Sequence, residues 1–187
     1  MSTRTWEGIA IPTPGVFDLD VAHTRVGFVT KHMMVSKVRG RFGDFAGTVT
    51  IAENPMESSA ELTIKTASID TGSDDRDNHL RSDDFLAVDK FPELTFRSTR
   101  VVSHSGDELV VVGDLTIRDV TKEVTLKVEY GGAGTNPWGQ ELFGFEIETE
   151  IEREEFGLTW NVALETGGVL VGKKIKIEIE GEAQRRA

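Results

Sequence analysis

The sequence predicts an all-β protein: an antiparallel β-barrel of about eight strands with a short helical segment inserted mid-chain. Apolar and polar residues alternate along about eight runs, which is typical of antiparallel strands with one solvated face. Turn residues separate these runs, and only residues 79–96 form a long segment without the alternation. Closing such a sheet would remove its edges, and about eight strands can enclose one small ligand.

The alternating runs occupy most of the chain. They cover approximately residues 16–20, 25–32, 42–51, 60–65, 94–102, 109–117, 124–130, 143–151 and 175–180. Gly40, Gly43 and Gly47 lie in or beside one run, where glycines favour the bends that a closing sheet needs. We expect an extended lead-in over residues 1–14, one barrel domain over residues 15–182 and a frayed C terminus over residues 183–187.

The segment over residues 79–96 has apolar residues at helical spacing, including Leu80 and Phe85. Ser82 and Asp83 precede an apolar turn, which is the place of an N-cap, and Pro92 ends any helix there. Asp74, Asp75 and Asp77 precede this segment, and acidic residues favour a helix start. The sequence therefore predicts short helical turns that plug one end of the barrel.

The composition excludes several classes of function. The chain has 21 Lys and Arg against 32 Asp and Glu, a net charge of −11, which disfavours nucleic acid as a partner. It has no cysteine, which rules out disulfides, thiolate metal sites and a cysteine nucleophile. It shows no signal-peptide core and no apolar run long enough for a transmembrane segment. These features predict a cytoplasmic protein.

Motifs for catalysis or cofactor binding are absent from the sequence. It has no GxSxG nucleophile elbow, no HExxH and no phosphate-binding glycine loop. The spacing of the histidines matches no zinc motif, and the run Asp74–Asp77 lacks the glycine and glutamate of a calcium loop. We therefore predict no metal, no cofactor and no catalytic residue.

The most distinctive set of side chains is the apolar one on the inner faces of the predicted strands. The alternation leaves two alternatives open: an ordinary filled core, or an apolar cavity with polar groups at its mouth. If a cavity exists, the apolar residues that we expect to bind its ligand are Phe28, Phe42, Phe45, Leu62, Ile64, Leu94, Phe96, Leu115, Phe143 and Phe145.

Several motifs resemble those of one family. They are Phe17-Asp18-Leu19-Asp20 with Ala22-His23-Thr24, Gly40-Arg41-Phe42, His79-Leu80-Arg81-Ser82-Asp83-Asp84-Phe85 with Phe91-Pro92, Gly113-Asp114-Leu115-Thr116-Ile117, and Phe156-Gly157-Leu158 with Trp160-Asn161. Together they resemble the YceI-like polyisoprenoid-binding family over roughly residues 15–182. Asp119 departs from the pattern, since the family often has glycine in that turn; aspartate tolerates turns, so the same fold is expected.

The resemblance implies a lipocalin-like barrel, often a homodimer, whose cavity takes a long isoprenoid tail such as a polyprenyl phosphate or a quinone. Many relatives resemble periplasmic proteins with signal peptides, and this chain shows none. The resemblance transfers no catalytic residue to this sequence.

Three hypotheses follow for the function. The first is a lipid-binding protein that sequesters or carries a polyisoprenoid or quinone-like lipid, with His32 and Arg41 at the head group. His32 shares strand parity with Phe28, and Arg41 is a nearby cation. The second is an enzyme that acts on such a lipid, with His23 and a carboxylate as the acid–base pair. The third is a barrel with a filled core.

Overall fold

The structure is a computed structural model that describes residues 3–187. It contains one α-helix and thirteen strands within those residues: β1 (Thr3–Trp6), β2 (Ile9–Pro12), β3 (Gly15–Leu19), β4 (Arg25–His32), β5 (Ser36–Phe42), β6 (Phe45–Ile51), β7 (Ser59–Lys65), β8 (Ile69–Asp70), α1 (Asp74–Arg81), β9 (Glu93–Ser105), β10 (Glu108–Ile117), β11 (Val120–Thr135), β12 (Glu141–Glu152) and β13 (Lys174–Arg185).

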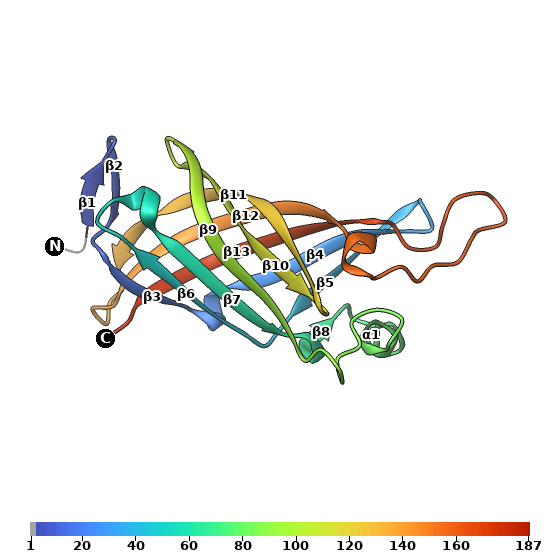
Figure 1. Cartoon of the computed structure of the whole chain (residues 1–187). Coiled ribbons are helices and arrows are strands. Elements are labelled where there is room, and N and C mark those ends of the chain that lie inside the picture. Colours follow the sequence, from blue (N-terminus) through green and yellow to red (C-terminus); the bar gives the residue numbers. More distant parts are fainter. Residues whose placement is uncertain (1–2) are drawn as a thin grey trace.

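Eight of these strands form a closed antiparallel ring (Figure 1). Their spatial order is β12, β11, β10, β9, β7, β6, β3 and β13, and β13 pairs again with β12. The predicted fold class, an eight-stranded antiparallel barrel with a short helix mid-chain, is therefore confirmed.

Three further strands, β4, β5 and β8, extend the sheet at one end of the ring. β4 follows β3 and pairs with β13, β5 precedes β6 and pairs with β4, and β8 follows β7 and pairs with β5. In the described chain β8 has no second partner, whereas β9 pairs with β7. The sheet is thus open between β8 and β9 at this end of the barrel, which we call the plug end.

The alternation predicted from sequence places charges on the outer face. Along β12, Phe143, Phe145 and Ile151 are buried, whereas Glu148 and Glu150 are exposed. β13 presents lysines to these carboxylates: Nζ of Lys176 lies 2.6 Å from Glu148, and Nζ of Lys174 lies 3.6 Å from Glu150. The expected pairing of these two charged faces is confirmed, and it supports the strand pair that closes the ring.

Helix α1 begins directly after Ser73, where the run of aspartates predicts a helix start. Ser73 is the N-cap, and its hydroxyl accepts a hydrogen bond from the Arg76 amide at 3.4 Å. The three aspartates lie in the first turn, as the dipole argument predicts. Ser82 ends α1, because its hydroxyl and its backbone amide both donate to the His79 carbonyl, at 2.6 and 3.1 Å. The same hydroxyl accepts a hydrogen bond from the Asp84 amide at 3.3 Å, so Ser82 also caps the apolar turn that follows, as the sequence predicts.

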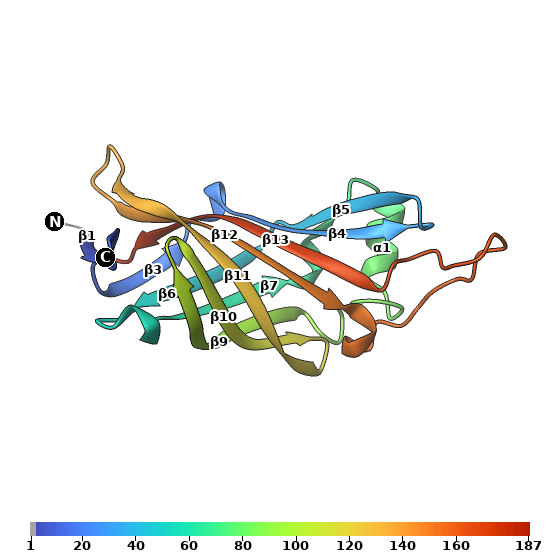
Figure 2. The same ribbon diagram turned by 90° about the horizontal axis from the view of Figure 1, so that it is seen from above.

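The turns after α1 fill the plug end. Phe85, Leu86 and Ala87 are buried, and Phe85 and Leu86 belong to a cluster with Leu115 and Ile117 of β10. In Figure 1, α1 and β8 lie at the end of the barrel opposite to both chain termini, and Figure 2 shows the long connection from β12 to β13 extending beyond the same end. The turns therefore stop the apolar interior at this end.

A buried arginine holds the loops around the plug together. Arg153 is 3% exposed, and it donates to the carbonyls of Leu158 at 2.6 Å, Gly172 at 2.8 Å and Val171 at 3.3 Å. Its guanidinium also lies 5.8 Å from the centre of the Phe85 ring. Burial lowers the pKa of Arg153, but arginine stays charged in proteins, so the three carbonyls satisfy a buried cation.

Both chain ends are more ordered in structure than the sequence predicts. Residues 3–12 of the expected lead-in form the β1–β2 hairpin, and residues 1–2 lie outside the described residues. The expected fraying is wrong for residues 183–185, because β13 continues to Arg185 and pairs with β3 there. Ala183 is fully buried at 0% exposure, so pairing and burial hold this segment.

We predict that Phe85→Ala destabilises the protein by about 3–5 kcal/mol, because it removes a buried ring and leaves a cavity in the plug. Urea unfolding followed by circular dichroism measures this change. Val35→Ala is the control: Val35 is 85% exposed, and its loss should change stability by less than about 0.5 kcal/mol. Equal stability of the two variants would contradict the role of Phe85 as a plug.

Candidate ligand-binding cavity

The barrel interior contains an apolar cavity of about 280 Å³, so side chains do not fill it completely. Its walls come from nearly every strand of the ring and from the β1–β2 hairpin. Nine of the twelve side chains predicted to bind ligand line it: Phe28, Phe42, Leu62, Ile64, Leu94, Phe96, Leu115, Phe143 and Phe145.

The other three predicted side chains do not line the cavity. Phe45 is buried beside it in the core cluster with Ile64. His32 lies at the end of β4, where its backbone pairs with Ser36 and bridges to Val171. Arg41 points outward and lies 3.6 Å from Asp70. His32 is therefore too far along β4 to meet a head group inside the cavity, and Arg41 is on the outer face of the sheet.

Two glycines make room for aromatic rings of the wall. A Cβ atom on Gly40 would lie 2.3 Å from the Phe28 ring, and one on Gly113 would lie 2.5 Å from the Phe96 ring. The predicted bend lies instead at Gly43, between β5 and β6. Gly40 thus serves close packing rather than bending, and it lets Phe28 fold against the sheet.

The β1–β2 hairpin covers the end of the barrel opposite the plug, which we call the hairpin end. Trp6, Ile9, Ile11 and Pro12 add apolar surface to the cavity there. These four residues are not among the predicted ligand-binding residues, because residues 1–14 were expected to form an extended lead-in. A signal was present: Glu7-Gly8 separates residues 3–6, which contain threonine and tryptophan, from the apolar residues 9–12, and a two-residue loop with glycine is typical of a hairpin.

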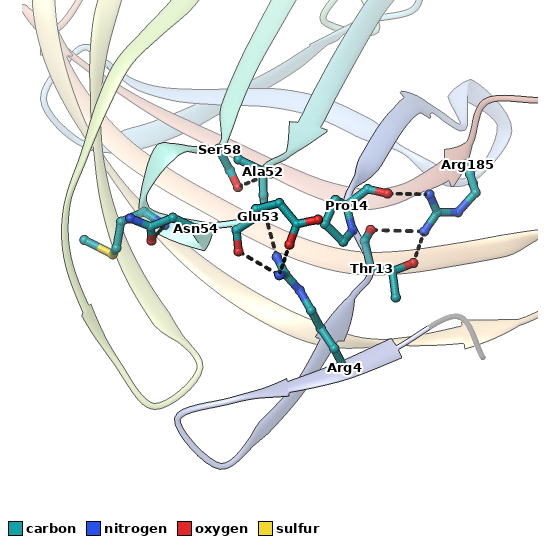
Figure 3. Close-up of polar contacts among 9 residues, drawn as sticks. Arg4, Thr13, Pro14, Ala52, Glu53, Asn54, Ser58 and Arg185 are labelled. Carbon is teal, nitrogen blue, oxygen red and sulfur yellow. Dashed lines mark hydrogen bonds and ion pairs between the residues drawn. The ribbon is translucent and has the colours of Figure 1, made fainter.

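Arginine side chains fix the hairpin to the barrel (Figure 3). Arg4 donates from Nη2 to the Ala52 carbonyl at 2.5 Å and from Nη1 to the Glu53 carbonyl at 2.7 Å. Arg185, near the other end of the chain, donates to the carbonyls of Thr13 and Pro14, each at 3.0 Å. These bonds hold the hairpin and its connection over the cavity.

Tyr130 connects the cavity wall to the hairpin. Its ring lines the cavity, and its hydroxyl donates to the Ala10 carbonyl at 2.8 Å. Burial raises the pKa of the Tyr130 phenol to about 12, so the hydroxyl keeps its proton across the physiological range. Tyr130 is therefore a permanent hydrogen-bond donor to β2.

His104 is the polar exception in the apolar wall. Its side chain is 8% exposed, its ring lies 4.1 Å from that of Trp6, and its Nδ1 lies 3.0 Å from Oε2 of Glu7. Its Nε2 is buried and has no hydrogen-bond partner in the described chain. Burying an unpaired polar group costs roughly 1–3 kcal/mol, so this atom calls for an explanation.

The candidate acid–base residue lies outside the cavity. His23 is exposed, and its Nδ1 lies 2.6 Å from Oδ2 of Asp20. Glu182 of β13 approaches the same pair, so three potential metal-ligand atoms lie within 4.8 Å of one another. Histidine spacing in the sequence could not reveal this group, because strand pairing brings Glu182 to it. Exposed acidic groups gather in this way without binding an ion, so we assign no metal here.

The comparisons with known proteins agree with the barrel fold. The family model described as YceI-like domain matches residues 17–183. The chain belongs to the YceI-like family. The resemblance read from the sequence motifs is thereby confirmed, and the β1–β2 hairpin lies outside the matched residues.

Three known proteins illustrate the similarity. A UPF0312 protein of Staphylococcus aureus (strain USA300) is 43% identical over 168 residues, which is 89% of this chain and 95% of the relative. The Campylobacter jejuni YceI crystal structure has a TM-score of 0.71 and 34% identity, and covers 90% of this chain and 97% of its own. A polyisoprenoid binding domain from Saccharophagus degradans has a TM-score of 0.65 and 14% identity, and the match covers 93% of this chain and 100% of that domain. At this identity, the likeness is one of fold alone.

Within residues 3–187, no helix has the length and apolar character needed to cross a membrane.

We predict that Tyr130→Phe loosens the hairpin, because the variant keeps the ring but loses the hydrogen bond to Ala10, worth about 1 kcal/mol. Amide hydrogen exchange in residues 3–12 should quicken, while exchange in β12 should not change. Thr149→Val is the control, since Thr149 also donates to a backbone carbonyl, that of Thr125, but far from the hairpin. Unchanged exchange in residues 3–12 would contradict the anchoring role of Tyr130.

The His23–Asp20 pair predicts a pH dependence. The hydrogen bond to Asp20 and its charge raise the pKa of His23 above the ordinary value of 6.5. Because the pKa of His23 is higher in the folded state than in the unfolded state, protonation of His23 stabilises the fold. This stabilisation is complete below the unfolded-state pKa of about 6.5 and is lost as the pH rises through the folded-state pKa. NMR titration of His23 should show this raised midpoint, and Asp20→Asn should lower it. An unchanged midpoint in Asp20→Asn would contradict the assignment.

Proposed function

We propose that this protein binds a long isoprenoid lipid, of polyprenyl or quinone type, in the barrel cavity and sequesters or carries it without covalent chemistry. The observation that carries the proposal is the cavity itself, whose wall runs from the β1–β2 hairpin to the plug and is almost entirely apolar. The Saccharophagus degradans domain described as polyisoprenoid binding shares this fold, which supports the choice of ligand class.

The energetics favour a long, narrow tail over a compact ligand. Burying each CH₂ contributes about 0.8 kcal/mol, so ten buried carbons contribute about 8 kcal/mol. Association costs about 4–15 kcal/mol in lost motion. A tail of several isoprene units is therefore needed for useful affinity, and the cavity would select its ligand by length and width.

The geometry supports binding more than catalysis. The enzyme hypothesis requires an acid–base pair at the cavity, and its named candidate, His23 with Asp20, lies on the outer surface. The filled-core hypothesis is not favoured, because the interior keeps a cavity of about 280 Å³.

Two further expectations stay predictions. The family resemblance predicts a homodimer, which light scattering after size-exclusion chromatography would measure. The sequence predicts a cytoplasmic location, which cell fractionation with an antibody would measure.

We predict that Phe145→Trp blocks uptake of a fluorescent polyprenyl probe and leaves the fold intact, because a larger ring at a buried wall position fills the cavity. Probe affinity should fall at least about tenfold, equal to roughly 1.4 kcal/mol. Val21→Trp is the matched control, because Val21 is 48% exposed and lies outside the cavity. Equal uptake by both variants, with circular dichroism unchanged, would reject binding in this cavity.

A further inference from the structure

We propose that His104 forms a head-group subsite for an uncharged isoprenoid that ends in a hydroxyl group, such as a prenol or a reduced quinone. This inference rests on the proposed function, since it assigns the polar end of a ligand whose tail lies in the cavity. The observation that carries it is the buried Nε2 of His104, which lines an apolar cavity and has no partner in the described chain.

Three other polar side chains of the wall already have partners. The Ser98 hydroxyl accepts from the Ala60 amide at 2.8 Å, the Thr149 hydroxyl donates to the Thr125 carbonyl at 2.8 Å, and Tyr130 donates to Ala10. Buried polar groups in folded proteins nearly always find a partner. A ligand group in the cavity would satisfy Nε2 where these neighbours cannot.

Glu7 determines which kind of group would fit. Its carboxylate only accepts hydrogen bonds and faces Nδ1 of His104 at 3.0 Å, so it favours the tautomer with the proton on Nδ1. In that tautomer Nε2 carries the lone pair and accepts a hydrogen bond. The matching ligand group is therefore a donor, and a hydroxyl group supplies one.

The charges around the cavity argue against a phosphate head group. Among residues 3–187, no lysine or arginine lines the cavity, although phosphate recognition normally uses such cations. Glu61 lines it, paired with Arg97 at 3.5 Å, and Glu7 lies beside His104. An uncharged hydroxyl group avoids both the repulsion and the cost of burying an anion without a cation.

The backbone holds this subsite in place. Glu7 lies at the turn of the hairpin with φ of 48°, followed by Gly8 with φ of 85°, so the two-residue loop that joins β1 to β2 presents Glu7 to β9. Trp6, the last residue of β1, packs on the His104 ring. The subsite therefore depends on the hairpin, which lies outside the residues that match the family model.

The test compares three probes that share one tail: geranylgeraniol, geranylgeranyl phosphate and the corresponding hydrocarbon without a head group. The wild-type protein should bind the alcohol roughly 3- to 10-fold more tightly than the hydrocarbon, as one hydrogen bond implies. His104→Phe keeps a ring beside Trp6 but has no nitrogen, and it should lose this preference while still binding the hydrocarbon. His32→Phe, a histidine variant outside the cavity, should keep the preference.

A preference retained in His104→Phe, or tighter binding of the phosphate than of the alcohol by the wild type, would overturn the subsite. If the wild type binds alcohol and hydrocarbon equally and Phe145→Trp blocks both, the subsite is wrong and the proposed function stands. If no probe binds, the proposed function itself fails. Should His104→Phe not fold, the ¹⁵N resonance of His104 Nε2 in the wild type decides: the alcohol should shift it and the hydrocarbon should not, and identical shifts would reject the subsite.

Discussion

The backbone pairing of β12 with β13 is the interaction on which the rest of the structure depends. It joins the first and last strands of the ring over Leu142–Glu152 and Lys174–Gln184, and so converts a curved sheet into a closed barrel. Closure turns one face of every strand toward a single interior. The large apolar residues on that face surround a space that they do not fill, and the cavity follows from the closure.

A closed barrel still has two ends, and this chain treats them differently. At the plug end, Phe85 and its neighbours pack into a continuous core, and buried Arg153 binds the surrounding carbonyls. At the hairpin end, a separate two-stranded element covers the cavity and is attached by hydrogen bonds from Arg4, Tyr130 and Arg185. Apolar packing closes the plug end. At the hairpin end, hydrogen bonds attach the covering hairpin, and His104 lies beneath it.

The alternation of residues was sufficient to predict the barrel and much of the cavity wall, because period two determines which face a side chain takes. It could not determine position along the barrel axis. His32 shares the parity of Phe28, yet it lies past the end of the cavity, near the turn after β4. Arg41 is adjacent to the wall residue Phe42 and therefore faces outward. The predicted run also ended at residue 102, whereas β9 continues through His104 to Ser105.

Sequence motifs and residue type did not predict the role of the hairpin or decide where α1 begins and ends. Residues 3–12 carry none of the family motifs, and their role depends on contacts with the turn after β6, with β9 and with β11, all distant in sequence. Ser73 and Ser82 are both good cap residues by type, and only their hydrogen bonds distinguish the start of α1 from its end.

The central claim is that the closed barrel holds an apolar tail, and native mass spectrometry of the full chain tests it most directly. The protein would be measured as purified, after extraction with organic solvent, and after incubation with a polyprenyl alcohol. We expect the extracted protein to regain a mass equal to one bound molecule, and Phe145→Trp not to do so. An extracted, folded protein that regains no apolar ligand would contradict the claim.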